Sequence, residues 1–348
     1  MLCELHPTKK IRYKRMKKNN LYLILAVVIL GVFAIVLITK QNSSSIKPEL
    51  RDFAVQDTAA VDKIFMVDKA NNQVVLTRED GRWVVNGKYT VRRDAINLLL
   101  KTLHRVRVKA PVPNTAKDNV LTMMATRNTK VEVYNKKKLI KTLYVGGPTQ
   151  DQMGTFMMLE GSSVPFVVSI PGFVGYLSTR FFILEREWRS PMIFLYNFDD
   201  IAEIKSVNNT DPDQSFRIKH RNEKFSIESL NGKLSTRVMD TLAVKFFISN
   251  YERVASEFFA DGLEQSIKDS LDAATPFRVL SVTDQQGKTT SVEAYRRKPG
   301  EQTDPELAVP EWDNERMYAK INDSDWVVIQ YFVFDLLFRD FNFFIPVE

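Results

Sequence analysis

Residue types that carry catalytic or metal chemistry are few in this 348-residue chain, and they are scattered along it. The sequence has three histidines, His6, His104 and His220, and one cysteine, Cys3. A transition-metal site needs several His, Cys or carboxylate ligands at short spacing. We find no such grouping, and no phosphate-binding loop or nucleophile-elbow motif. The sequence therefore predicts no catalytic, cofactor-binding or metal-ligating residues.

Some polar residues still permit a chemical interpretation beside a structural one. Asp199-Asp200 and the pair Asp323 and Asp325 could flank a glycosidic bond, but their positions near predicted turns favour capping and solvation. We expect His104 at the C-terminal end of a helix, where its ring interacts with the helix dipole. His220, between two basic residues, is expected to be a solvated residue at a turn.

For the loop-forming residues, too, a structural role is expected rather than a chemical one. Gly146-Gly147-Pro148 is expected to be a hairpin turn, and Ser162-Ser163 a loop pair without an adjacent base. The basic run 136–138 is expected at a hairpin tip, and the run 296–298 is expected at the start of the insert in the second repeat. They either keep the protein in solution or contact anionic components of a cell envelope.

Composition and charge exclude several classes of protein. With 44% hydrophobic and 26% charged residues, the chain is globular, and it is long enough for two domains. The formal net charge of +7 comes from its N-terminal end, because residues 41–348 hold equal numbers of basic and acidic residues. We therefore predict no nucleic-acid partner.

The apolar run 21–39 dominates the N-terminal region. As a helix it would be about 28 Å long, which matches a bilayer core. Basic residues crowd positions 1–20, so the run predicts a transmembrane helix with a cytoplasmic N-terminus and an exported remainder. A cleaved signal peptide is the alternative, but the run is long and lacks a small-residue cleavage pattern.

The remainder of the chain repeats one order of elements. Residues 40–60 are polar at their start and are expected to be a tether. Beyond them we predict two tandem homologous α+β domains, 61–195 and 196–348, each with an antiparallel sheet and helices on one face. The helix expected at 92–106 corresponds to one at 236–255.

Two features of the second repeat need explanation. The polar, Pro-rich segment 297–312 has no counterpart of that length in the first repeat and is expected to be a surface excursion. The apolar segment 326–338 is interrupted by polar residues, so it is expected to be a buried strand and a helix rather than a second membrane span.

Aromatic residues gather at the ends of the two repeats. Phe181-Phe182, the set Phe194, Tyr196 and Phe198, and the set Phe341, Phe343 and Phe344 are expected to be partly exposed. Exposed aromatic side chains of this kind pack against another domain or another protein.

This layout resembles a known family. The residues that carry the resemblance are Gly81-Arg-Trp83, Thr155-Phe-Met-Met158, Arg316-Met-Tyr318 and Asp325-Trp326. They resemble an uncharacterised, membrane-anchored bacterial family whose domain of unknown function also occurs in the exported part of the gliding-motility auxiliary ABC-transporter component. The resemblance implies a setting in the Bacteroidota, at the periplasmic face of the inner membrane. It offers no catalytic residues, and Asp57-Thr58-Ala59 resembles an O-glycosylation signal of such bacteria.

Three functional hypotheses follow. The first is a non-enzymatic periplasmic scaffold or accessory subunit of a transport, secretion or gliding-motility assembly, held in the bacterial inner membrane by residues 21–39 and bound to other envelope proteins. The second is a binding module for a glycan, lipid or peptide in a cleft between the repeats. An enzyme that uses dispersed carboxylates is the third.

Overall fold

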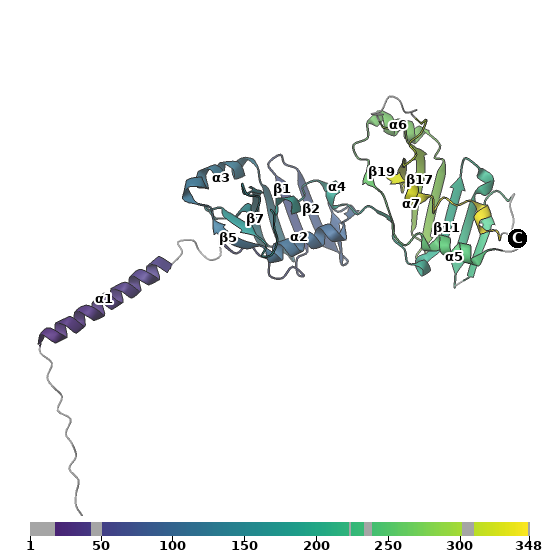
Figure 1. Ribbon diagram of the computed structural model, residues 1–348. Helices are drawn as coiled ribbons and strands as arrows, with labels where there is room; N and C mark the ends of the chain where they lie inside the picture. Colours follow the sequence, from purple (N-terminus) through teal and green to yellow (C-terminus); the bar gives the residue numbers. More distant parts are fainter. Residues whose placement is uncertain (1–17, 43–50, 223, 233–238, 301–309, 347–348) are drawn as a thin grey trace, which may run out of the picture. The chain divides into compact units, whose positions relative to one another are not determined.

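The computed structural model describes residues 18–42, 51–222, 224–232, 239–300 and 310–346 (Figure 1). In helix α1 (Lys18–Asn42) it describes the side chains of residue 22 and of 25–36. Several predicted features lie outside the described residues: nearly all of the basic tail with Cys3 and His6, residues 43–50 of the expected tether, and 301–309 of the expected excursion.

Helix α1 covers the apolar run, and it changes the prediction made from that run. In the part of the chain that the structure describes, we find no helix with the length and apolar character needed to cross a membrane. This finding corrects two predictions, the transmembrane helix over 21–39 and the single-pass location in the bacterial inner membrane with a periplasmic bulk.

The first half of the chain contributes a nine-stranded sheet in the order β4-β3-β2-β1-β6-β7-β8-β9-β5. Its strands are β1 (Lys63–Asp68), β2 (Gln73–Glu79), β3 (Arg82–Val85), β4 (Tyr89–Thr90), β5 (Arg107–Pro111), β6 (Thr129–Asn135), β7 (Lys138–Pro148), β8 (Thr155–Leu159) and β9 (Phe166–Ser169).

The second half contributes an eight-stranded sheet in the order β13-β12-β11-β16-β17-β18-β19-β15, and the pair β10-β14 forms a small third sheet. These strands are β10 (Met192–Phe194), β11 (Ile201–Asn208), β12 (Phe216–Arg221), β13 (Lys224–Ser229), β14 (Val254–Ala255), β15 (Phe258–Phe259), β16 (Arg278–Asp284), β17 (Thr289–Arg296), β18 (Arg316–Ile321) and β19 (Asp325–Gln330). Neighbours in the eight-stranded sheet are antiparallel.

Helices are short apart from α1. The α-helices are α2 (Arg93–Arg105), α3 (Asn114–Thr126), α4 (Glu185–Trp188), α5 (Thr241–Ser249), α6 (Gln265–Ala273) and α7 (Tyr331–Phe334). The 3₁₀ turns are η2 (Ser178–Arg180), η3 (Phe198–Asp200), η4 (Pro212–Gln214) and η5 (Phe341–Phe344).

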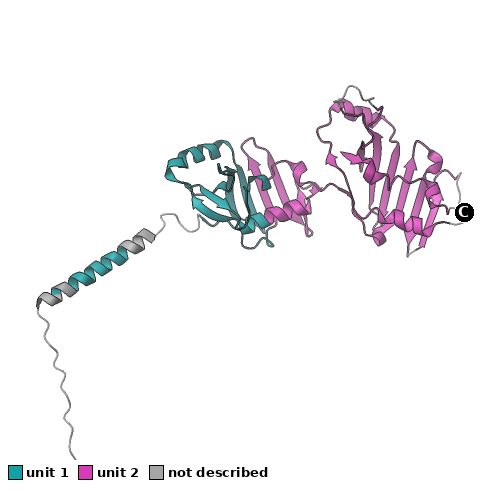
Figure 2. Cartoon of the chain, viewed as in Figure 1, with its two compact units in different colours: residues 1–61, 101–181 teal, residues 62–100, 182–348 magenta. Residues whose placement is uncertain are grey.

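The two large sheets have related strand orders, yet the chain does not divide into two tandem domains. Apart from β4, the strands of the larger sheet follow one another in the same pattern as those of the eight-stranded sheet. The strands nevertheless form three sheets, and the compact units are discontinuous. Unit 1 comprises 1–61 and 101–181, and unit 2 comprises 62–100 and 182–348 (Figure 2). The predicted architecture of two tandem domains is therefore wrong.

Unit 1 contains the strands from β5 to β9 and helix α3. Val120 and Met124 of α3 form a small core with Val112, and partly buried side chains of the sheet, including Tyr144, pack against it. Phe53 belongs to the segment expected to be a tether, but it is fully buried, and its ring lies 5.9 Å from that of Phe166. This part of the segment is therefore packed into unit 1.

Unit 2 has helices on both faces of its eight-stranded sheet. Val244, Phe247 and Ile248 of α5 belong to the main core, whereas Leu271 of α6 packs with Trp326 and Val328 in a separate cluster. Alternate residues of a strand face opposite sides. Strand β19 is buried on both sides as a result, and the prediction of helices on one face is corrected for this sheet.

Candidate functional site

Among the described residues, no group of three or more His, Cys, Asp or Glu side chains could hold a metal ion. Asp200 accepts hydrogen bonds from the backbone and side-chain nitrogens of Asn197, which confirms the capping interpretation. Asp323 pairs with Lys320 at 2.8 Å, and this contact lowers the pKa of its carboxyl group.

One histidine prediction is confirmed and the other is wrong. His104 lies in the last turn of α2, and its Nδ1 is 3.2 Å from the carbonyl oxygen of Val55. His220 lies within β12 and is buried, with its ring stacked on Phe225 at 4.7 Å. Its Nδ1 is 3.0 Å from the carbonyl oxygen of Ile201, so it is a hydrogen-bonded core residue.

One turn prediction is confirmed and another is wrong. Lys136 and Lys137 have φ angles of 46° and 66° and form the tip of the β6–β7 hairpin, as expected. Gly146-Gly147-Pro148 is not a turn, because it forms the end of strand β7. A Cβ atom on Gly146 would lie 3.0 Å from Met124, so glycine permits α3 to approach the strand.

The aromatic residues expected at the surface lie mostly in the interior. Phe181, Phe194, Phe341 and Phe344 are buried, and within this group of predicted residues Phe343 is the exposed one. Aromatic side chains remove a large apolar area from water when they are buried, and here that area stabilises the cores.

An ion cluster around the buried Arg189 joins residues of unit 2 that are distant in the sequence. Arg189 follows α4 and forms a backbone bridge with Val91. Its Nη1 donates to both carboxylate oxygens of Asp261, at 3.0 and 3.1 Å, and its Nη2 is 3.3 Å from Oδ1 of Asp325. The hydroxyl of Tyr89 donates to the same Asp325 oxygen at 3.1 Å.

Aromatic rings complete the cluster. The guanidinium carbon of Arg189 lies 3.8 Å from the ring centroid of Tyr89 and 3.9 Å from that of Phe259. Arg189 is only 3% exposed, so a substrate has little access to it. The cluster fastens β4 to β15 and β19, and its role is structural. The spacing of Arg189, Asp261 and Asp325 gives no signal in the sequence.

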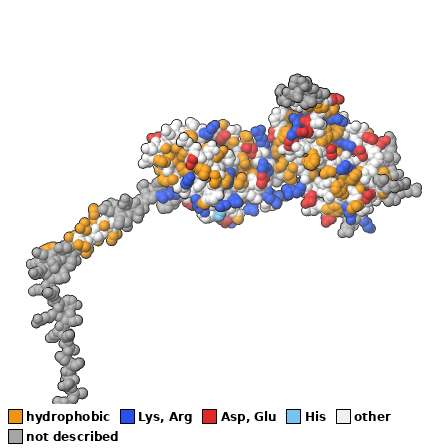
Figure 3. Space-filling model, in the orientation of Figure 1, with side chains coloured by type: hydrophobic (Ala, Val, Ile, Leu, Met, Phe, Trp, Pro, Cys, Tyr) orange, Lys and Arg blue, Asp and Glu red, His pale blue; other side chains and the backbone are white. Residues whose placement is uncertain are grey.

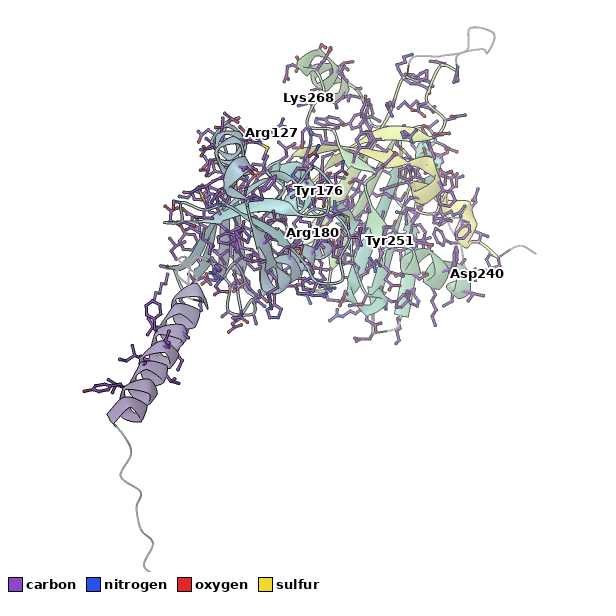
Figure 4. All side chains as sticks on the ribbon, turned by 60° about the vertical axis from the view of Figure 1, so that its left-hand side comes forward. Arg127, Tyr176, Arg180, Asp240, Tyr251 and Lys268 are labelled. Atoms are coloured by element: carbon purple, nitrogen blue, oxygen red, sulfur yellow. The ribbon has the colours of Figure 1, made fainter. Side chains whose placement is uncertain are left out.

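Exposed apolar side chains gather on the outer side of α5. Leu242 and Phe246 are 76% and 50% exposed and lie one turn apart on the helix, so they share a face. Phe343 of η5 is also exposed, and the carbonyl oxygen of the adjacent Phe344 accepts a hydrogen bond from the backbone N–H of Asp240, the residue that caps α5 (Figure 4). We call Leu242, Phe246 and Phe343 the α5 surface.

Another surface combines cations and aromatic rings around Trp312. The guanidinium carbon of Arg296 lies 6.0 Å from the ring of Trp312, and Nζ of Lys298 lies 4.1 Å from it. A depression of about 330 Å³ in the same unit is lined by Asn314, Glu315, Gln330 and Phe332. We call the two cations, Trp312 and Phe332 the Trp312 surface. On the face that Figure 3 shows, basic and acidic side chains both occur among the described residues.

Comparison with protein families gives one match. A domain of unknown function (DUF4340) matches residues 82–246. The DUF4340 match begins at the first residue of β3 and ends within α5, so it includes the whole segment between the two large sheets. It supports an uncharacterised domain family, whereas the predicted link to a gliding-motility transporter is not part of it. Neither curated proteins nor solved structures give a significant match.

Proposed function

We propose that this chain is a non-enzymatic protein-binding module that acts as a scaffold or accessory subunit of a larger assembly. The α5 surface carries the proposal. Soluble proteins expose single apolar residues commonly, but several on one helix face and its neighbouring turn favour contact with another protein. The opposite face of α5 is packed into the main core, so the helix presents Leu242 and Phe246 from a fixed support.

The apolar area on this surface is enough to contribute to binding. Complete burial of a leucine or phenylalanine side chain is worth about 1.5–3 kcal/mol. Leu242 and Phe246 together could therefore act as the central contact of an interface, with more polar residues around them. The resemblance stated above makes a transport, secretion or gliding-motility assembly the first place to look for the partner.

The proposal is tested by a photo-crosslinking amino acid placed at position 246 in the full chain in cells. We expect one recurrent protein partner in stoichiometric amounts, identified by mass spectrometry, and loss of that partner in the L242S/F246S variant. Position 174 provides the matched control, because Val174 is 75% exposed but lies in unit 1.

Two outcomes would contradict the proposal. Crosslinks at 246 that are no more specific than those at 174 would show that the α5 surface is not an interface. A partner retained equally by L242S/F246S would show that its binding does not depend on these side chains. Circular dichroism of the variant establishes that the fold is intact, which is expected because both substituted side chains are exposed.

A further inference from the structure

The three basic residues at the end of β17 point to different sides. Arg297 pairs with Asp313 at 3.4 Å and lies 5.7 Å from the ring of Tyr318. Arg296 and Lys298 both approach Trp312 instead. This follows from the alternation of side chains along an extended strand, in which residues two apart share a side. Two cations are therefore presented together, and the residue between them is neutralised.

The described part of the chain supplies neither cation with an ion-pair partner. Arg296 contacts the rings of Phe277, at 5.4 Å, and Trp312. Lys298 contacts Trp312 and donates to the backbone oxygen of Glu311 at 3.5 Å. Both cations are exposed, so they can reach an anionic group in solution. The rings restrict where the charged groups lie, which lowers the entropy lost when an anion binds.

An apolar contact is available beside the cations. The depression is lined by Asn314 and Glu315, from the segment that holds Trp312, and by Gln330 and Phe332 from a second segment. The backbone N–H of Tyr331 donates to the carbonyl oxygen of Glu315 at 3.0 Å, which joins the two segments. Phe332 is 88% exposed and therefore offers a ring to an apolar side chain.

The surrounding acids decide which kind of anion fits. Asp313 neutralises Arg297, and Glu315 pairs with Arg316 at 2.9 Å, which itself pairs with Glu257 at 2.8 Å. Burial raises the pKa of the Tyr331 hydroxyl, while the charge of Arg296 acts to lower it and that of Asp335 to raise it. Of these residues only Arg296 and Lys298 keep an uncompensated positive charge, which is fewer than the row of basic residues that follows the successive phosphates of a nucleic acid. Separate carboxylates on a peptide can pair with Arg296 and Lys298 alone.

We propose that the Trp312 surface binds an acidic peptide segment of a partner protein. The carboxylates of the segment pair with Arg296 and Lys298, and one of its apolar side chains packs against Phe332 in the depression. This site is separate from the α5 surface, so a negative result for one proposal leaves the other unaffected.

The test measures binding by isothermal titration to the purified full chain. The probe is a short glutamate-rich peptide with one central phenylalanine, and the same peptide with alanine at its centre is compared. We expect the R296Q/K298Q variant to bind the probe at least about tenfold more weakly than the wild type, with a further loss at high salt. The F332S variant should bind the two peptides equally.

The matched control is K137Q/K138Q, which removes two exposed lysines from the β6–β7 hairpin and should bind the probe as the wild type does. Equal binding by R296Q/K298Q and the wild type, or no binding by the wild type, would overturn the proposal. Competition by millimolar inorganic phosphate, or tighter binding of oligothymidylate than of the peptide, would also overturn it, because either result would show a site for phosphate.

Discussion

Arg189 is a charged residue whose burial has a large expected consequence. Replacing it with methionine leaves Asp261 and Asp325 without their shared cation, and breaking a buried ion pair costs about 3–5 kcal/mol. Because the carboxylates of Asp261 and Asp325 are 46% and 28% exposed and can be hydrated, we expect less than this, a loss of about 1.5–3 kcal/mol in the free energy of unfolding for the charged hydrogen bonds, measured in urea. The exposed pair of Arg92 and Asp94 is the control, and R92M should cost less than about 1 kcal/mol. Equal losses would show that the cluster is not structural.

Tyr251 links stability to alkaline pH. It is fully buried, burial raises the pKa of its hydroxyl well above the ordinary value, and that hydroxyl has no hydrogen-bond partner among the described residues. Above pH 10, the unfolded chain loses this proton while the folded chain keeps it, so stability falls as pH rises.

Tyr251→Phe should therefore flatten the decline of the unfolding free energy above pH 10. At pH 7 it should leave stability unchanged or raise it by about 1 kcal/mol, because no hydrogen bond is lost. Tyr295→Phe is the contrasting variant, since the Tyr295 hydroxyl donates to Glu293 at 2.8 Å and its loss should cost stability at pH 7. Denaturant unfolding across the pH range tests both, and an unchanged alkaline slope in Tyr251→Phe would refute the first.

The positions of single residues were predicted correctly where their partners are neighbours in the sequence. The capping by Asp200 and the helix-end position of His104 both follow from neighbours in the sequence. His220 was misplaced because its basic neighbours indicated solvent, whereas alternation along β12 puts it on the buried face with Phe216 and Ile218. Arg189 was missed because its partners come from strands far along the chain, and only the fold brings them together.

Gly146 controls how closely α3 packs on its sheet. A methyl group at this position would lie 3.0 Å from both Cγ of Met124 and the backbone oxygen of Phe156, and the backbone atom cannot move without disturbing the strand. We expect Gly146→Ala to lower the free energy of unfolding by about 1–3 kcal/mol through overpacking.

Gly147 is the matched control on the same strand. A methyl group there would have its nearest contact at 4.0 Å, with the sulfur of Met123. Gly147→Ala should therefore change stability by less than about 1 kcal/mol. Thermal unfolding of the two variants measures the difference. A larger loss of stability in Gly147→Ala than in Gly146→Ala would contradict the close packing of α3 on the strand.

Most elements were predictable, but their arrangement was less so. The expected helix at 92–106 is α2, and the helix expected at 236–255 includes α5. The helices were expected on one face because periodicity shows which side of a helix is apolar and not which face of a sheet it covers. The run Trp326-Val-Val-Ile329, buried on both faces, was the available signal.

At the scale of the molecule, residues before position 196 complete the core of unit 2. Phe194 is fully buried, and its ring lies 5.1 Å from that of Tyr251. A fragment of residues 196–348 would lack this side chain and strand β10, whereas one of 182–348 would keep both. We expect the shorter fragment to melt at a lower temperature, and Phe194→Ala in the full chain to cost about 3–5 kcal/mol. Equal melting temperatures would show that 196–348 holds a complete core.

The internal similarity of the sequence led us to predict two tandem domains. The division of the chain into compact units does not follow from that similarity. Similar strand orders arise from similar local patterns, and both large sheets show them. Compactness depends on contacts such as those of Arg189 with Tyr89 and Val91, which join 62–100 to 182–348. A pattern of apolar residues carries no information about such contacts.

The placement of the tryptophans has an optical consequence. Trp83, Trp188 and Trp326 are at most 9% exposed, whereas Trp312 is only partly buried and lies beneath two cations. A collisional quencher such as iodide reaches an indole through solvent, and the nearby positive charges attract it. The readily quenched part of the native fluorescence therefore comes from one position, and the protein has an intrinsic, label-free reporter on its own surface.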